Sequence, residues 1–505
     1  MSTEKIILWD QGDFFHFLLA HSLQKKINSE LYAIFDITEK QKPFYQKQKF
    51  VDYKKIWFFH DAISQSRKKI DVKYLNSFEE KYNINLWLLA MNERLFNEFN
   101  EFHKFSREDI LSILEDECKL FEKILEEIKP TFLIVDKNFH HQELFYQICR
   151  VQGIRTLILN QSVFGSKWVL SERTHMFDKN RTLEEFETSN RSFDELEKYW
   201  KEFQLRKKFD SYLESSQTSK TQKFKAGFDF FTSPNTTVKN NYGYYGHTKL
   251  KVLVNYFVGI LKKNLRSNYI DKNLSHVIDD SVPFVYFPLQ IMPERSLLIN
   301  SPFNTNQIEI IKHISKSLPI GYRLYVKEHP IQVTREWRKI SFYKEILSIP
   351  NVQFLHHSVK IEDVMKKCSL LITINGAAGL EAAIYKKPSI IFSEGEHFSY
   401  SNLPSVHKLK SIDELPTAIR SSLRKKVDPT DVDKYFNLLD ANTFDFDMFG
   451  FDLDYHNYFY HGGNLLDVEI PEEKVKQFIK KHESLFDKVA DEYIKKIEQH
   501  SNFKL

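Results

Sequence analysis

The sequence predicts an α/β protein with two open, parallel-sheet domains that face a cleft, a helical insert between them and a helical tail. Short apolar runs alternate with longer helical patterns over residues 1–190 and again over 281–425, as expected of βαβ units. Residues 191–280 are instead charged and helical, and 426–505 are mostly helical. A chain of 505 residues has room for two or three such units.

In the first domain the apolar runs predict strands, and the stretch between two of them predicts a helix that Ser106 can cap. The predicted strands cover residues 5–10, 55–61, 131–136 and 154–160. Asp13 follows the first strand in a glycine turn, and Asp136 ends the third. Parallel strands bring their carboxyl ends to one edge, so either aspartate can serve as a base there if burial tunes its pKa.

His140 and His141, just beyond Asp136, are further candidates for the base. The alternative for the aspartates is structural, because aspartates at strand ends often cap the following helix.

The insert is predicted as a helix over 192–216, a polar loop over 232–248 and an amphipathic helix over 249–270 that carries lysines and an arginine. One interpretation of this last helix is attachment to an anionic membrane surface. The preferred interpretation is a connector packed against its neighbours, with a solvated basic face.

The second domain repeats the α/β pattern more sharply. Its predicted strands cover 283–289, 323–328, 352–355, 370–374 and 388–392. The strand in "RLYVKEHP" delivers Lys327 and His329 to the carboxyl edge of the sheet. The strand in "LLITINGAAGLEAA" leads into a turn of small residues, which lets a ligand approach the backbone closely.

These two strand ends predict a site for a nucleotide mono- or diphosphate. The turn supplies Asn375, Gly376, Ala377, Ala378 and Gly379. Glu381, in the first helical turn, can accept hydrogen bonds from a ribose diol.

The loop after the first strand of this domain adds Gln290, Glu294 and Arg295, of which Arg295 can clamp an anionic group. A plain strand-to-helix turn, a capping histidine and a surface ion pair are the structural alternatives for these features.

Composition excludes several classes. A net charge of +4 over 505 residues predicts no nucleic-acid partner. Cys118, Cys149 and Cys368 form no CxxC pair, which predicts free thiols in a reducing compartment. The amino-terminal residues lack the pattern of a signal peptide, and no run of 18 apolar residues occurs, so we expect a cytoplasmic protein, peripheral to the membrane at most.

No metal site is predicted. The segment "FDFDMFGFDLD" places Asp445, Asp447, Asp452 and Asp454 close together, but it lies in the tail without the strand context of a metal-binding DxD motif. We interpret it as a solvated acidic loop. The zinc, Walker and nucleophile-elbow motifs are absent from the sequence.

The motifs "FPLQIMPERS", "YVKEHP", "NGAAGLEAAIYKKPSIIF" and "YSNLPSV", in this order, resemble those of the bacterial capsule polysaccharide biosynthesis proteins. That family includes Kdo transferases and related surface-carbohydrate glycosyltransferases. The resemblance implies a GT-B fold of two Rossmann-like domains, with residues 1–190 on the acceptor side and residues 281–425 binding the nucleotide sugar. By it, His329 and the turn from Asn375 to Glu381 hold the donor's phosphate and ribose.

The resemblance further implies a metal-independent glycosyltransferase that uses a CMP- or UDP-linked sugar and a glycan or lipid-linked glycan acceptor, without another cofactor. Asn375 stands where such proteins often have serine or threonine before the glycine turn. A nucleotide-sugar epimerase of the same two-domain architecture is the alternative enzyme, but it needs several acids around one sugar, and the first domain shows no clear cluster of acids. A non-catalytic glycan- or nucleotide-binding subunit is the third hypothesis.

Overall fold

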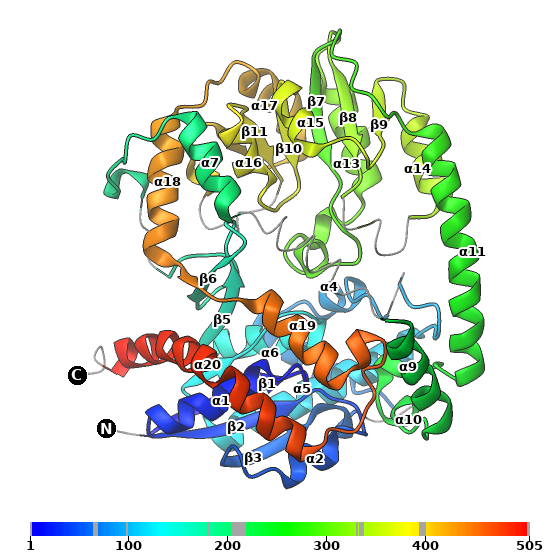
Figure 1. The fold of residues 1–505 in the computed structure, drawn as a ribbon, viewed down its shortest axis with the longest axis vertical. Helices are drawn as coiled ribbons and strands as arrows, with labels where there is room; N and C mark the ends of the chain where they lie inside the picture. Colours follow the sequence, from blue (N-terminus) through cyan, green and yellow to red (C-terminus); the bar gives the residue numbers. More distant parts are fainter. Residues whose placement is uncertain are drawn as a thin grey trace.

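The structure is a computed structural model that describes residues 3–63, 69–96, 99–178, 182–203, 219–329, 332, 338–392 and 400–501. Two parallel-sheet α/β domains lie one above the other in Figure 1. The lower sheet has the strand order β13-β6-β5-β4-β1-β2-β3, and the upper sheet β12-β11-β10-β7-β8-β9. The predicted α/β fold class, with two parallel-sheet domains and a helical C-terminal region, is confirmed.

Six of the seven described strands of the lower sheet come from the first third of the chain, and β13 comes from the tail. The six are β1 (Glu4–Asp10), β2 (Ser29–Phe35), β3 (Tyr53–Phe58), β4 (Phe132–Ile134), β5 (Arg155–Gln161) and β6 (Lys167–Ser171). Strands β1 to β5 are parallel and β6 is antiparallel. In β1, four consecutive residues from Ile6 to Trp9 are fully buried, because helices cover both faces of the sheet.

Different helices cover the two faces of this sheet. One face packs on α1 (Phe15–Lys26) and on the end of the chain, and the other on α3 (Val72–Tyr82), α5 (Arg107–Ile128) and α6 (His140–Val151). Ser106 caps α5 in a capping box with Asp109, as predicted. Two short helices, α2 (Lys42–Lys47) and α4 (Leu86–Met91), complete the domain.

The upper sheet takes β7 (Phe284–Pro288), β8 (Arg323–Lys327), β9 (Val352–Leu355), β10 (Leu370–Thr373), β11 (Ser389–Ile391) and β12 (Val406–Lys408). All six strands are parallel. The helices of this domain are α12 (Arg295–Leu298), α13 (Gln307–Ser317), α14 (Ile340–Leu347), α15 (Ile361–Lys367), α16 (Ala378–Ile384) and α17 (Leu415–Ser422).

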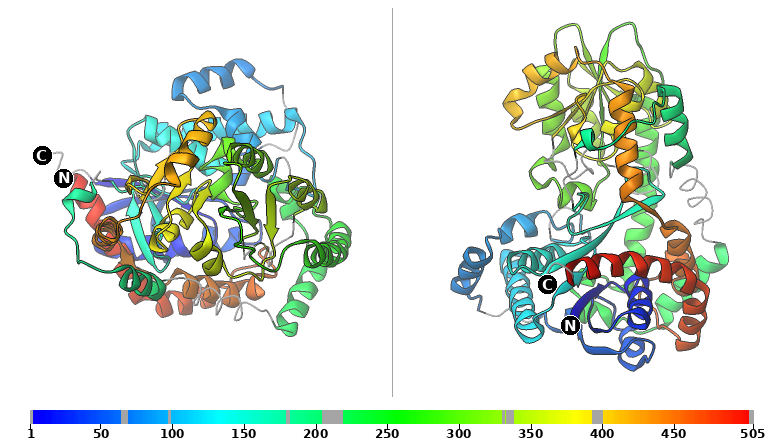
Figure 2. Two further views of the ribbon diagram at one scale, coloured as in Figure 1. Left: turned by 90° about the horizontal axis from the view of Figure 1, so that it is seen from above. Right: turned by 90° about the vertical axis from the view of Figure 1, so that its left-hand side faces the viewer.

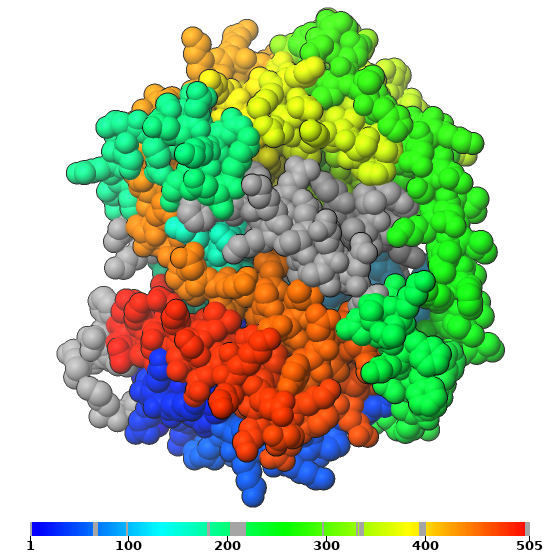
Figure 3. Space-filling view, viewed as in Figure 1, coloured from blue at the N-terminus to red at the C-terminus, as the bar shows by residue number. Residues whose placement is uncertain are grey.

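The described residues join the domains on two sides, at the left and right edges of the molecule in Figure 3. On one side α11 (Lys249–Asn273) runs from the lower domain to the upper, where Ile270 enters the core. On the other side, α7 (Phe193–Phe203) and α18 (Pro429–Asn442) pack with the loop between β5 and β6 in a separate apolar cluster. Arg191 and Asp433 form a buried ion pair there. Figure 2 shows both connections from other directions.

The tail returns to the lower domain. Strand β13 (Phe444–Asp445) pairs with β6, and α19 (Met448–Phe459) and α20 (Glu472–Ser501) pack on α1 and the face of the sheet. Asp445 and Asp447 are exposed to solvent as expected, but the interpretation of the acidic segment as a loop is wrong, because its residues form β13 and α19. The aromatic residues between the acids cause this, since Phe446 and Phe451 are buried.

Two predictions for the insert need correction or completion. The stretch predicted as a polar loop contains α10 (Thr237–Asn240) and the turn η3 (Tyr242–Tyr244), and it buries Tyr242 in the lower core. Helix α7 confirms the start of the helix predicted over 192–216, whose residues from 204 lie outside the described ranges. Also described is α9 (Lys220–Thr232). None of the described helices has the length and hydrophobicity needed to cross a bilayer.

Candidate active site

The carboxyl edges of the two sheets face each other. Asn138, which follows β4, and Glu294, which follows β7, line one small opening together. A larger cavity of about 790 Å³ lies beside it, between Asn92 and Glu101 below and Met292, Asn306 and Arg338 above. The cleft that the sequence predicted between the domains therefore exists, and among the predicted site residues Glu294 lines it.

In the upper domain, hydrogen bonds link the three predicted loops. Gln290, after β7, donates from Nε2 to Thr373 Oγ1 at 3.1 Å and to the Asn375 carbonyl at 3.2 Å. The Gln290 carbonyl accepts from Arg338 Nη2 at 2.5 Å, and the same guanidinium holds Glu328, beside His329, at 3.1 Å. One chain of contacts thus runs from the end of β8 past β7 to the end of β10.

The glycine turn after β10 is fixed by Tyr400. Its hydroxyl donates to the Gly376 carbonyl at 2.7 Å. Gly376 has a φ of +91°, a conformation that favours glycine. A Cβ on Gly379 would lie 2.8 Å from the Tyr400 ring and hydroxyl, so Gly379 is required for packing rather than for ligand approach. Asn375 is buried, and its Nδ2 donates to Ser301 Oγ at 3.1 Å.

The remaining predicted residues of this domain have different surroundings. Lys327 is buried, and its Nζ donates to the His357 carbonyl at 3.3 Å, towards β9 and away from the turn. Glu381 lies in the first turn of α16. Burial raises the pKa of Tyr286, and the charge of Glu381 raises it further. Arg295 begins α12, and its side chain lies outside the described residues.

His329 is half-buried, and its backbone N–H donates to Glu328 Oε1 at 3.3 Å. It shares the cleft-facing edge with Gln290 and the glycine turn, because β7 lies between β8 and β10. Neighbouring strands are about 4.8 Å apart, so the ends of β8 and β10 are separated by about 10 Å. A pyrophosphate group with its ribose is long enough to contact both.

In the lower domain, the structure brings Asp13 and Asp136 together. Their carboxylates and the imidazole of His16 offer ligand atoms within 4.8 Å of one another. His16 Nε2 lies 4.0 Å from Asp136 Oδ2. Asp10, at the end of β1, is fully buried beside them and accepts from the Gly12 N–H at 2.7 Å. We call Asp10, Asp13, His16 and Asp136 the acid cluster.

Burial and mutual repulsion shift the pKa values in the acid cluster. Burial raises the pKa of Asp13 to about 6, with Asp136 raising it further and His16 opposing the shift. Burial and the charge of Asp13 raise the pKa of Asp10 to about 8. Burial lowers the pKa of His16. An acid with a pKa near 6 can accept a proton at neutral pH, so Asp13 is suited to act as a base.

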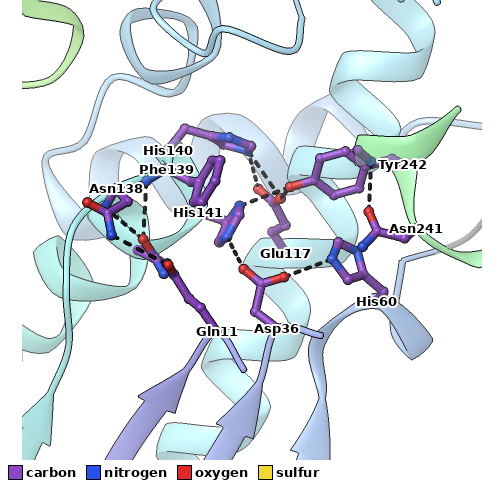
Figure 4. Close-up of polar contacts among 12 residues, drawn as sticks. Gln11, Asp36, His60, Glu117, Asn138, Phe139, His140, His141, Asn241 and Tyr242 are labelled. Atoms are coloured by element: carbon purple, nitrogen blue, oxygen red, sulfur yellow. Dashed lines mark hydrogen bonds and ion pairs between the residues drawn. The ribbon is translucent and has the colours of Figure 1, made fainter. Parts of the chain in front are cut away.

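A second polar network occupies the same edge, beyond the carboxyl ends of β2 and β3 (Figure 4). His141 Nε2 contacts Asp36 Oδ2 at 2.9 Å, and the other oxygen of Asp36 contacts His60 Nε2 at 2.8 Å. Tyr242, from the insert, lies 2.9 Å from His141 Nδ1. Burial raises the pKa of Asp36, but the two histidines outweigh burial and hold it well below its usual range.

The surroundings of His140 indicate a structural role for this residue. Its two ring nitrogens contact Glu93 and Glu117, each at 3.0 Å, and all three side chains are buried. Burial lowers the pKa of His140, but the two carboxylates outweigh it and raise the pKa to about 10. A histidine held charged at neutral pH cannot accept a proton, so His140 is unsuited to be the base.

Several residues of the site were missed in the sequence. Asp10 ends a strand that was predicted, and Asp36 follows the apolar run of β2, so both could have been found by the rule that found Asp136. His16 lies on α1 and Asp452, whose charge also raises the pKa of Asp13, on α19. No local pattern marks these two, because their neighbours come from distant parts of the chain.

Comparisons with known proteins agree with the predicted family resemblance. Residues 230–400 match the family model described as capsule polysaccharide biosynthesis protein. This range contains the first three of the four motifs on which the resemblance was based, and the resemblance is confirmed there. No curated protein sequence matches the chain.

Among solved structures, the chain is similar to UDP-GlcNAc 2-epimerase from Methanocaldococcus jannaschii, at 14% identity and a TM-score of 0.25, covering 85% of this chain and 95% of that one. It is also similar to Thermosulfurimonas dismutans KpsC, a beta Kdo 2,7 transferase, at 11% identity and a TM-score of 0.31, covering 65% and 83%.

Proposed function

We propose that this protein is a glycosyltransferase of capsule or surface polysaccharide biosynthesis that transfers a sugar from a nucleotide-sugar donor to a glycan or lipid-linked glycan acceptor. One observation supports the proposal: two sheets present their carboxyl edges to one cleft, where Asn138, two residues after Asp136, and Glu294, in the loop after β7, line the same opening. The family match over 230–400 supports the substrate class.

In the proposed reaction, the upper edge binds the nucleotide and the lower edge activates the acceptor. Backbone and side-chain donors at His329, Gln290 and Gly376 stabilise the phosphate that leaves. Asp13 takes the proton of the acceptor hydroxyl as this oxygen attacks the anomeric carbon. The bond from sugar to phosphate breaks, and the nucleotide departs with its electron pair. We propose a CMP- or UDP-linked donor and an enzyme that works in the cytoplasm, at the inner face of the membrane.

The test separates the two edges. We expect His329→Ala to weaken nucleotide binding, measured as the thermal shift caused by CMP, CDP, UDP and GDP. We expect Asp13→Asn to bind the nucleotide normally but to lose transfer, measured by mass spectrometry of the acceptor.

Two matched controls, His313→Ala on α13 and the exposed Asp52→Asn, should behave as the wild type. Full transfer by His329→Ala would end the assignment of the upper edge.

The acid cluster also matches the geometry of a cation site, so the metal independence that we propose needs its own test. Transfer should continue in EDTA. Loss of activity in EDTA, with recovery on adding Mg²⁺ or Mn²⁺, would instead assign Asp13, His16 and Asp136 to a metal ion.

One observation supports the alternative hypothesis that the protein is an epimerase. An epimerase needs several acids around one sugar, and the expectation that the first domain lacks such a cluster is wrong, because Asp13 and Asp136 meet across 123 residues of chain. Incubation with a nucleotide sugar and no acceptor distinguishes the two activities. A new nucleotide sugar would establish an epimerase, and an unchanged donor agrees with a transferase.

A further inference from the structure

The outer side of the insert exposes an extended apolar surface. On α11, Leu253, Phe257 and Leu261 lie on one stripe at a spacing of four residues, and Phe257 and Leu261 are 57% and 64% exposed. The exposed apolar residues of α11 are Leu250, Leu253, Val254, Tyr256, Phe257, Val258, Ile260, Leu261 and Leu265. At 1.5 Å per residue they extend for about 22 Å.

Helix α9 continues this surface. Phe224, Phe228 and Phe231 lie at the helical spacing of one face, and all three are exposed, Phe224 to 75%. The two helices meet where Lys249 Nζ donates to the Ser233 carbonyl at 3.0 Å. Figure 1 shows α9 beside the lower end of α11, at the edge of the molecule. We call the exposed apolar residues of α9 and α11 together the insert face.

Three polar side chains of α11 reach towards the rest of the molecule. Lys262 pairs with Glu101 at 3.0 Å, Lys251 donates to the Phe102 carbonyl, and Arg266 lines the cavity between the domains. The preferred interpretation of this helix as a connector with a solvated basic face holds for Lys251 and Lys263, which are exposed, but its packing against neighbours is wrong along the middle turns. The helix does connect the domains, but it directs much of its apolar surface to the solvent.

The charge around the insert face indicates the chemical class of a partner that can bind there. Residues 219–268 contain nine lysines and arginines against one acid, Asp229, a net charge of +8. The whole chain carries only +4, so the remainder of the chain is net negative. Lys220, Lys223 and Lys225 on α9 and Lys263 on α11 are exposed at the borders of the apolar stripes. Exposed apolar side chains bordered by lysines suit an anionic lipid surface.

We propose that the insert face docks on a membrane that contains anionic lipids. The apolar side chains of α9 and α11 enter the boundary between headgroups and acyl chains, and the bordering lysines contact lipid phosphates. Since Arg266 and Phe99 line the cavity beside α11, docking brings the cleft to the membrane surface, where a lipid-linked acceptor resides. This last consequence depends on the proposed function, whereas docking itself does not.

The experiment measures flotation of the whole protein with vesicles, so it requires no donor or acceptor. The wild type should float with vesicles of phosphatidylethanolamine and phosphatidylglycerol, far less with pure phosphatidylcholine, and less in high salt, which screens the lysines. The variant Leu253→Ser/Phe257→Ser/Leu261→Ser should lose binding by about tenfold or more. Because these side chains are exposed, its thermal stability should be unchanged.

Two further variants complete the test. Lys220→Glu/Lys223→Glu should weaken binding only to the anionic vesicles. Phe303→Ser/Ile320→Ser removes two exposed apolar side chains of the upper domain and should float as the wild type does.

The proposal is overturned if the wild type fails to float with either vesicle, or if the triple serine variant floats equally well. A lipid-free dimer that this variant converts to a monomer would also overturn it, because a second copy would then cover the insert face.

Discussion

The pKa of Asp13 gives the most specific prediction, because it is raised and the charge of a neighbouring residue contributes to the rise. The ordinary pKa of 3.8 rises to about 6 through burial and the charge of Asp136. A general base must be deprotonated, so kcat/KM should fall tenfold for each pH unit below about 6. At pH 5 the wild type should therefore work at about a tenth of its plateau rate.

Two variants identify the source of that pH dependence. Asp136→Asn removes a negative charge that disfavours ionisation of Asp13, so its acid limb should move to lower pH. Asp13→Asn should lower the plateau itself by roughly 10²–10⁴-fold. The assay is the initial rate of nucleotide release from the donor, measured with saturating acceptor between about pH 4.5 and 8.

An acid limb of the pH profile that does not move in Asp136→Asn would contradict the assignment of Asp13 as the base. An Asp13→Asn enzyme that keeps both the rate and the acid limb of the wild type would contradict it as well. If instead Asp136→Asn alone abolishes turnover, Asp136 is the base and Asp13 is the group that tunes it.

The remaining predictions concern stability. Gly379→Ala should lower the free energy of unfolding by about 1–3 kcal/mol in a urea titration, because the added Cβ meets Tyr400. Gly321→Ala, whose Cβ would have no neighbour within 4 Å, should leave this free energy unchanged. Equal effects of the two substitutions would contradict the role of Gly379 in packing. Glu117→Gln should destabilise the fold by about 2–3 kcal/mol, since it removes one partner of a buried charge, and a Tm unchanged by this variant would contradict the assignment of His140 as charged. The charge of His140 should stabilise the fold fully below pH 6.5, the ordinary pKa of histidine, and this stabilisation should be lost as the pH rises through about 10. His140→Gln should therefore reduce the fall in Tm at alkaline pH. A fall that is unchanged in this variant would contradict the raised pKa of His140.

Much of the fold was predictable because its signal is local. Strand β9 matches its predicted range at both ends, and β1, β8 and β10 match within one residue. Three of the four described strands that were missed had weaker signals: β12 and β13 are three and two residues long, and β6 pairs antiparallel at the side of the sheet. The seven-residue run of β2 was also predictable, and missing it concealed Asp36.

The candidate site was predictable only where it lies at strand ends. Asp136 and His329 were found because the carboxyl ends of parallel strands share an edge. The contribution of Arg338, which links Glu328 to Gln290, could not be predicted, because residue 338 lies in a loop without a motif. Tyr242 was assigned to a polar loop, although its ring fills the lower core and its hydroxyl contacts His141.

The sequence by itself determined the alternation of strands and helices, the two α/β domains and the strand ends on which polar residues stand. These depend on the periodicity of apolar residues and on turn chemistry, which act over a few neighbouring positions. The tertiary structure decided that Asp13, His16 and Asp136 meet, that the tail adds Asp452 to them, and that α11 turns its apolar side outward. Such features depend on which distant surfaces pack together, and burial and Coulomb forces between those surfaces then set the pKa values.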